Sequence, residues 1–359
     1  MSRGKSWFKT ATLEDILFVS AIDQIGSISW HKLYKAFSSL AAVLSADKNK
    51  LRQIGLTEVM ANKLKEPRPN STRALKAMER YRIKLVTLGE PHYPKLLKEI
   101  NDPPLWLFYR GDLSATNVPC LTVVGSRKPS PNAYANMENL LPASLVRDIC
   151  LISGLAYGID HKTYQLAVKN NGLTVAVLAG GLDDIYPSSH EQLAEEIIDK
   201  GGALISEYPP LSRPASHRFP IRNRIIAGLS PATVIVEAAI KSGTLITAKC
   251  AIDYNRDVFA LPGDINRPTA QGTNFLIKNG AIPLDSAEQL FHYFGLTAQV
   301  TRDEEIDSPV WRSLKDSPKT IDEIVAQTKL PIESVMVELT KLELIQKVYQ
   351  PEIGCYGRK

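Results

Sequence analysis

Short apolar runs separated by amphipathic stretches fill the middle of the chain. Each run ends in a Gly or Ser turn and is followed by a stretch of helical periodicity. Runs that are apolar at consecutive positions are typical of strands buried on both faces, as in a parallel sheet. The pattern therefore predicts an α/β fold, a Rossmann-like doubly wound parallel sheet, over residues 111–300. The predicted strands are Leu121–Val124, Ile149–Ile152, Thr174–Leu178, Ala203–Ile205, Thr233–Val236 and Val258–Leu261.

The region before this sheet has a different pattern. Short helical periodicities between residues 12 and 80 are broken at Ile25–Ser27 and Ile54–Leu56, as in hairpins between short helices. We expect a helix-hairpin-helix or SAM-like helical module over residues 1–85. Residues 86–110 are rich in proline and then apolar, which predicts a linker packed on the core.

The last segment, residues 305–359, predicts a winged-helix domain. Thr320–Glu323 forms a capping box before helical patterns at 321–327 and 332–344. A two-stranded wing is expected from Ile345–Gln350, a turn at Pro351–Gly354, and Cys355–Tyr356.

The second helix of this domain is acidic. It holds Glu333, Glu338 and Glu343 against Lys341, and such side chains oppose phosphate. A transcription factor led by this domain is therefore disfavoured, and a protein-contact or inert role is preferred.

Composition narrows the class of protein. The chain has 359 residues, is 44% hydrophobic and carries 43 Lys+Arg against 38 Asp+Glu, a net charge of +5. Wholesale disorder is excluded. The four cysteines form no C-x-x-C pair, which argues against zinc and disulfides and fits a reducing cytosol. The run Ile16–Ile22 is too short to cross a membrane, so we expect a cytoplasmic protein without a membrane partner.

The charge is unevenly distributed along the chain. Residues 1–110 have a net charge of +9, whereas the rest is slightly acidic. Within the predicted sheet, Tyr208–Val236 contains Arg213, Arg218, Arg222 and Arg224 and no acid. The basic helical module and this arginine run both suit an anionic partner.

Four Gly/Ser turns each follow a predicted strand. The carboxyl ends of parallel strands share one edge, so these turns should converge on one crevice. Glycine permits close approach of a ligand to the backbone, and helix N-termini offer free N–H groups. Beside the run His217–Arg224, the turns predict a polyanion site. They are Gly125–Arg127, Ser153–Asp160, Gly180–Asp183 and Lys241–Thr244.

Several reactive motifs are missing from the sequence. It has no G-x-G-x-x-G, no Walker A loop, no H-E-x-x-H and no G-x-S-x-G, and its six histidines show no metal spacing. No nucleophile–base pair stands out. We therefore expect no cofactor, no metal and no catalysis.

The middle segment resembles the DNA-processing protein A (DprA/Smf) family. The most specific match is Phe219–Ser230, the string Phe-Pro-Ile-Arg-Asn-Arg-Ile-Ile-Ala-Gly-Leu-Ser. Further matches are Val124–Arg127, Ser153–Asp160, Gly181–Asp183 with Tyr186-Pro187, Ser206-Glu207, Val236–Ala238 with Ser242–Thr244, Leu261–Gly263, Gly272–Asn274 and Gly280-Ala281. The two end domains are similar to accessory domains of that family.

The resemblance implies a function. Family members bind single-stranded DNA, help to load the RecA recombinase onto it during natural transformation, and typically act as dimers. Arg127, Arg222, Asn223 and Arg224 would hold phosphates, the glycine turns would supply backbone donors, and Phe219 would pack on a base. The DNA-binding residues expected are Gly125, Ser126, Arg127, Lys128, Gly154, Gly158, Gly181, Arg218, Phe219, Arg222, Asn223, Arg224, Lys241, Ser242, Gly243 and Thr244.

Two positions depart from the family pattern. Tyr157 stands where the family commonly has Arg, and His190 stands where Asn is usual. The tyrosine ring either stacks on a base or packs against the protein. DNA affinity should then depend more on Arg127 and residues 218–224.

An enzyme is the alternative function. Nucleotide phosphoribohydrolases share this fold class and carry Pro-Gly-Gly-x-Gly-Thr-x-x-Glu at the corresponding strand end. Only Gly243-Thr244 remains here, with Thr247 at the position of the carboxylate. Asp160, Glu207 and Glu237 lie near the expected crevice, and we expect them to cap helices or pair with arginines.

Overall fold

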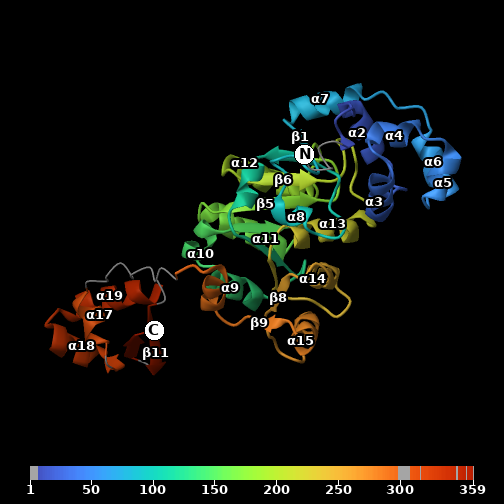
Figure 1. Ribbon diagram of the computed structural model, residues 1–359. Helices are drawn as coiled ribbons and strands as arrows, with labels where there is room; N and C mark the ends of the chain where they lie inside the picture. Colours follow the sequence, from blue (N-terminus) through green and yellow to red (C-terminus); the bar gives the residue numbers. More distant parts are fainter. Residues whose placement is uncertain (1–6, 298–307, 316, 345–346, 353, 359) are drawn as a thin grey trace. The chain divides into compact units, whose positions relative to one another are not determined.

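The structure is a computed structural model that describes residues 7–297, 308–315, 317–344, 347–352 and 354–358 (Figure 1). It divides into two compact units, Met1–Ala298 and Gln299–Lys359. The first unit contains the helical module and the sheet, and the second is the C-terminal domain. No helix among the described residues is long and apolar enough to cross a membrane.

The first unit is built on a nine-stranded sheet, counted over the described residues, in the order β1-β2-β6-β5-β4-β3-β7-β8-β9. Strands β3 to β9 pair in parallel, while β1 and β2 are antiparallel to their neighbours. The predicted parallel sheet is confirmed. The strands are β1 (Lys84–Thr87), β2 (Trp106–Gly111), β3 (Cys120–Val124), β4 (Cys150–Ser153), β5 (Leu173–Leu178), β6 (Ala203–Ser206), β7 (Ala232–Ile235), β8 (Asp257–Ala260) and β9 (Ile282–Pro283).

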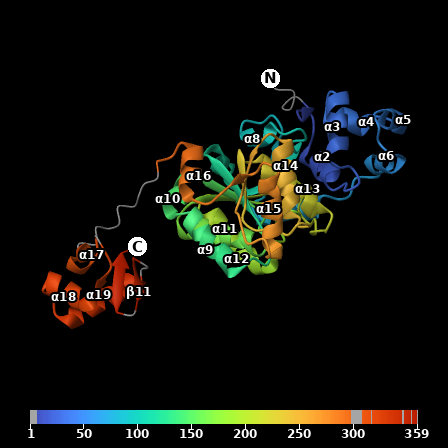
Figure 2. The ribbon, with the colours of Figure 1, turned by 90° about the horizontal axis from the view of Figure 1, so that it is seen from below.

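Helices cover both faces of this sheet (Figure 2). Alternate residues of β3 show the reason. Leu121 and Val123 pack with α9 and α11 on one face, whereas Thr122 Oγ1 donates to Ile226 O of α13 on the other. Both faces of the sheet are therefore covered, either by apolar packing or by hydrogen bonds to the covering helix, as the continuous apolar runs predict. The helices are α8 (Lys95–Lys98), α9 (Pro131–Leu140), α10 (Ala143–Asp148), α11 (Ile159–Lys169), α12 (Glu191–Asp199), α13 (Arg218–Gly228), α14 (Thr244–Asp253), α15 (Gln271–Lys278) and α16 (Ala287–Phe294).

The helical module consists of short capped helices, as predicted. Side chains of Thr12, Ser39, Asp47 and Thr57 accept N–H groups of the following turns. Its apolar residues join the core of the sheet, where the Trp30 and Trp106 rings meet edge to face at 5.2 Å. The helices are α2 (Leu13–Ser20), α3 (Ser27–Ala36), α4 (Leu40–Ser45), α5 (Lys48–Gln53), α6 (Glu58–Leu64) and α7 (Thr72–Arg80).

The structure differs from the predicted linker at residues 86–110. This segment contains the second half of β1, the short helix α8 and most of β2, and β2 pairs with β6. The prolines at 91, 94, 103 and 104 interrupt the apolar pattern between the two strands. Because each strand is short and the segment between them is rich in proline, the sequence alone favoured a linker.

The second unit has the predicted winged-helix architecture. Thr320 and Glu323 make both hydrogen bonds of the predicted capping box. The strands form a sheet in the order β10-β12-β11 over a core that includes Trp311, Ile324 and Leu339. Predicted wing residues 345–346 and 353 lie outside the described residues. The elements are α17 (Pro309–Ser313), β10 (Lys319–Thr320), α18 (Ile321–Thr328), α19 (Ile332–Leu344), β11 (Val348–Glu352) and β12 (Cys355–Arg358).

Candidate nucleic-acid interface

A cavity of about 610 Å³ opens where the strand order reverses, between β3 and β7. Such switch points are where open α/β sheets bind ligands. The turn after β3, the start of α13 and the segment after β7 line it, together with Ala156 and Asp160. We name this cavity the switch-point cavity. The predicted DNA-binding residues that line it are Gly125, Ser126, Arg127, Lys128, Phe219, Arg222, Asn223, Lys241, Ser242, Gly243 and Thr244.

Three cations stand exposed around the switch-point cavity: Arg127, Lys128 and Lys241. None of them forms an ion pair within the described part of the chain. The Arg127 guanidinium lies 5.4 Å from the centroid of the Phe219 ring, a cation–π contact that orders it without neutralising it. These side chains are therefore available to an anionic ligand.

Hydrogen bonds join the two turns that carry these cations. Thr244 Oγ1, at the start of α14, donates to Gly125 O at 3.0 Å, and Asn223 Nδ2 donates to Gly243 O at 3.3 Å. The rim therefore connects β3, α13 and α14. A rim fixed in this way reduces the conformational entropy lost when a ligand binds.

Arg222 forms part of the cavity lining but is only 5% exposed. Its Nη1 donates to Gly154 O at 2.6 Å and also to Val177 O. Burial lowers the pKa of Arg222, and the nearby Asp160 carboxylate opposes that shift. A Cβ on Gly154 would collide with the guanidinium. Arg222 is thus a buried cation beneath the cavity, and residue 154 must be glycine for it to lie there.

Two arginines of the predicted phosphate-binding run lie outside the lining. Arg218 Nη2 donates to both carboxylate oxygens of Asp23 at 2.7 and 2.6 Å. Arg224 Nη2 donates to both oxygens of Glu207 at 2.6 and 2.5 Å, and its Nη1 donates to Asp102 O. The structure therefore places Arg218 and Arg224 away from the cavity lining, with both guanidiniums buried against acids of this chain.

The predicted glycines Gly154, Gly158 and Gly181 also lie outside the lining. Gly158 has a φ of +77°, and a Cβ there would collide with Ser126 O of the turn after β3. Gly181 N–H donates to Ser212 O at 2.7 Å. These glycines let loops of the chain approach one another, and the structure does not bring them into the lining of the switch-point cavity.

Carboxylates of the chain already occupy several backbone donors at this edge. Asp160 Oδ2 accepts the N–H groups of Gly154 and Ala156 at 3.1 and 3.3 Å. Burial raises the pKa of Asp160 despite the opposing charge of Arg222. The expectation that Asp160 caps a turn is confirmed, and the donors of the β4–α11 turn are not free for a ligand.

The other two acids have similar roles. Glu237 accepts the N–H and the hydroxyl of Ser130, the N-cap of α9, and pairs with Arg267 at 3.2 Å. Glu207 pairs with Arg224 at 2.5 Å. The predicted capping and pairing of these carboxylates is confirmed. Among the described residues, no group of three or more His, Cys, Asp or Glu side chains is placed to hold a metal ion.

One aromatic residue at this edge is absent from the predicted DNA-binding residues. Tyr186 is 54% exposed, and its ring centroid lies 6.0 Å from that of Phe219. It follows the Gly-Leu-Asp turn after β5. The match of Tyr186-Pro187 to the family pattern and its place after a turn were the available signals, since an exposed ring has no periodic pattern.

Comparison with known proteins places this geometry in a family. Residues 84–295 match the family described as DNA recombination-mediator protein A, and residues 297–350 match its winged-helix domain. The chain is 35% identical over 309 residues to Protein Smf of Escherichia coli, covering 82% of this chain and 83% of that protein. It is 35% identical to the DNA processing protein DprA of Bacillus subtilis, covering 74% and 88%.

Solved structures agree with these sequence matches. The structure of DNA processing protein A from Streptococcus pneumoniae superposes with a TM-score of 0.66 at 29% identity, covering 77% of this chain and 97% of that one. A structure of the Helicobacter pylori protein, whose title describes its single-stranded DNA binding mode, gives a TM-score of 0.51 at 28% identity, covering 58% and 95%. The chain therefore belongs to the DNA recombination-mediator protein A (DprA/Smf) family.

Proposed function

We propose that this protein binds single-stranded DNA at the switch-point cavity without catalysing a reaction on it. One observation carries the proposal: three exposed cations without ion pairs in the described residues line one cavity together with the aromatic ring of Phe219, against which Arg127 lies. Single-strand binders combine these same elements, because cations follow the phosphates while aromatic faces stack on bases of any sequence. The Helicobacter pylori relative, whose title names single-stranded DNA, supports the same ligand class.

The residues have distinct roles in this proposal. Arg127, Lys128 and Lys241 bind phosphate oxygens, and the planar guanidinium of Arg127 suits a bidentate contact. Phe219 stacks on a base. Arg222 contributes positive potential from beneath the cavity, since it is buried and its Nη1 already donates to two carbonyls.

The absence of catalysis rests on the carboxylates. Asp160, Glu207 and Glu237, the acids nearest the cavity in the sequence analysis, all hold structural hydrogen bonds. Thr247 lines the cavity where the phosphoribohydrolases carry a carboxylate. We therefore expect no release of base from nucleoside monophosphates, and chromatography after prolonged incubation with the purified protein checks this.

Salt titration tests the binding site. Affinity for an oligo-dT strand should fall with salt, and Arg127→Ala should weaken it about tenfold while making the slope about 0.7 less negative, because one fewer phosphate is neutralised. Lys169→Ala is the matched control, since this exposed lysine lies on α11 and does not line the cavity. Unchanged binding by folded Arg127→Ala, or an equal loss in the control, would reject the site.

The family to which the chain belongs suggests a more specific role for the bound strand. We propose that the bound strand is passed to the RecA recombinase and that the protein acts as a dimer. Strand exchange by the recombinase on DNA coated with single-strand-binding protein should start sooner when this protein is added. An Arg127→Ala variant should lose that acceleration, and light scattering should give twice the mass of the chain.

A further inference from the structure

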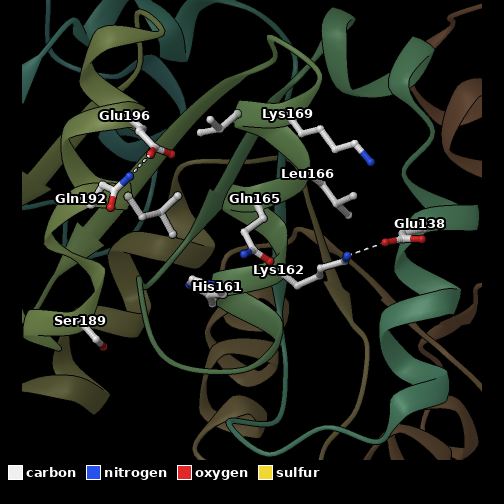
Figure 3. Close-up of a pocket in the computed structure, with 11 residues that line it drawn as sticks. Glu138, His161, Lys162, Gln165, Leu166, Lys169, Ser189, Gln192 and Glu196 are labelled. Atoms are coloured by element: carbon white, nitrogen blue, oxygen red, sulfur yellow. Dashed lines mark hydrogen bonds and ion pairs between the residues drawn. The ribbon is translucent and has the colours of Figure 1, made fainter.

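The turn that carries Tyr157 and the start of α11 contribute residues to the linings of two cavities. On one side, Ala156 and Asp160 line the switch-point cavity. On the other side, His161 and Lys162 line a second cavity of about 560 Å³ beside α11 (Figure 3). Tyr157 directly follows Ala156 in the chain and lines neither cavity itself.

The Tyr157 ring is fixed in place yet half exposed. Its hydroxyl accepts a hydrogen bond from Ser189 Oγ at 3.3 Å, and its ring meets that of His190 edge to face, with centroids 5.0 Å apart. Even so, 50% of the residue is open to solvent. Core packing does not account for an aromatic side chain that is held on one side and open on the other.

Two stacked imidazoles support the ring from behind. His190 is 4% exposed, and its Nδ1 lies 3.0 Å from Leu155 O. It stacks on His161 with centroids 4.5 Å apart and planes 27° apart. Burial and the neighbouring His190 lower the pKa of His161. The packed imidazoles hold the Tyr157 ring in place, and an ordered ring loses little entropy when a flat group stacks on it.

Within the described part of the chain, the second cavity offers no further cluster of unpaired cations that could bind the phosphates of the strand. Lys162 Nζ is in hydrogen-bond contact with Glu138, and Gln192 donates to Glu196 at 2.9 Å (Figure 3). With Lys169 the lining carries two lysines and two glutamates, so their charges balance. Phosphates gain nothing by entering it. The contact that the chain offers at this end is therefore the neutral face of a tyrosine.

We propose that Tyr157 is a stacking platform for the last base of the bound strand, at the end of the switch-point cavity that faces α11. This inference rests on the proposed single-strand binding and adds one residue with a defined contact. The strand gains dispersion and desolvation energy from the ring, and it releases no counterion there. Where the resembled family commonly has arginine, the tyrosine offers a ring rather than a charge, so the expected contact differs in kind.

Two variants of the full chain separate stacking from other roles. Tyr157→Ala should weaken oligo-dT binding about tenfold with an unchanged salt slope, because base stacking is lost and no phosphate contact changes. Tyr157→Phe keeps the ring and should bind within about twofold of the wild type. Tyr134→Ala is the matched control, since this exposed tyrosine lies on α9 rather than on the β4–α11 turn and makes no ring contact with His190, and it should bind as the wild type does.

A fluorescent base locates the contact. Oligo-dT strands with a single 2-aminopurine at successive positions should show one position, near one end of the bound segment, whose fluorescence is quenched by the wild type and by Tyr157→Phe. Tyr157→Ala should release that quenching alone. A thermal melt of each variant within a few degrees of the wild type shows that the fold is intact.

The outcomes are distinguishable. If the wild type binds with an Arg127-dependent salt slope and Tyr157→Ala keeps both its affinity and its quenching, the platform is rejected while the proposed function stands. A Tyr157→Ala variant with a flatter salt slope also rejects it, since the residue would then act through phosphate contacts. If the wild type does not bind single strands, both proposals fail.

Discussion

The basic residues at the carboxyl edge of the sheet fall into two groups with opposite roles. Arg218 and Arg224 of α13 are buried in bidentate pairs with Asp23 and Glu207. Arg127 and Lys241, on the turns after β3 and β7, are exposed without ion pairs in the described part of the chain. The comparison teaches that a run of arginines in a sequence predicts a binding site only where its charge is not neutralised within the fold.

The buried group joins the helical module to the sheet. Asp23 lies just after α2, and Asp102, which Arg224 also contacts, accepts a hydrogen bond from Ser27 of α3 at 3.0 Å. Tyr254, the C-cap of α14, donates to the same Asp102 carboxylate at 2.8 Å. The specific arginine string of α13 therefore holds two parts of the first unit together, in addition to lining the switch-point cavity through Arg222.

The largest effect should come from removing one buried guanidinium. Arg224→Ala leaves Glu207 and Asp102 without their cation, and breaking a buried pair from one side typically lowers the free energy of unfolding by about 3–5 kcal/mol. Burial alone would lower the pKa of Arg224, but Glu207 and Asp102 outweigh burial and raise it. Urea denaturation measures the loss. Arg127→Ala should change the free energy of unfolding by less than about 0.5 kcal/mol. Equal losses in the two variants would contradict the division of the basic residues into a buried and an exposed group.

Two glycine substitutions test how tightly the buried Arg222 is packed, with the second-largest expected effect. Gly154→Ala places a methyl group against the Arg222 guanidinium and should lower the free energy of unfolding by about 1–3 kcal/mol, as overpacking does. Gly243→Ala is the matched control, because a Cβ there meets nothing within 4 Å. Denaturation of both variants decides the point, and a stable Gly154→Ala would mean that Arg222 is free to move.

The smallest effect is a pH dependence of the buried contacts. His31 Nε2 lies 2.7 Å from Pro103 O, and burial lowers the pKa of His31, with Arg224 and Lys35 acting in the same direction. The unfolded chain then binds the proton more readily than the folded one. The contribution of His31 should therefore make stability fall as pH drops below about 6.5.

Denaturation at several pH values, with His31→Gln as the comparison, measures this contribution. The variant should lose less stability between pH 7.5 and 5.5 than the wild type does. An identical pH profile in the two proteins would show that His31 does not take up a proton differently on unfolding.

The sequence predicts the elements of the fold better than its long-range pairs. The strands β3 to β8 follow from apolar runs, and the caps at Ser130 and Thr320 follow from side chains within three residues of their donors. The pairing of β2 with β6 joins residues about a hundred positions apart, and no local pattern shows it. Residues 86–110 were therefore interpreted as a linker.

The candidate site was predictable in its location but not in the orientation of its side chains. Convergence of the strand-end turns follows from the parallel topology. Residues two apart on a helix point to different sides, so Arg222 and Arg224 separate once α13 forms. The partner of Arg218 lies 195 residues away, and only the folded chain shows it.

The salt dependence of single-strand binding by a triple variant tests the central claim most directly. Arg127→Ala, Lys128→Ala and Lys241→Ala together remove the exposed cations and leave every buried pair intact. We predict a folded protein of wild-type stability whose log–log salt slope is less negative by about 2, from three lost phosphate contacts at roughly 0.7 each. An unchanged slope would contradict the account, because the strand would then be held by cations elsewhere.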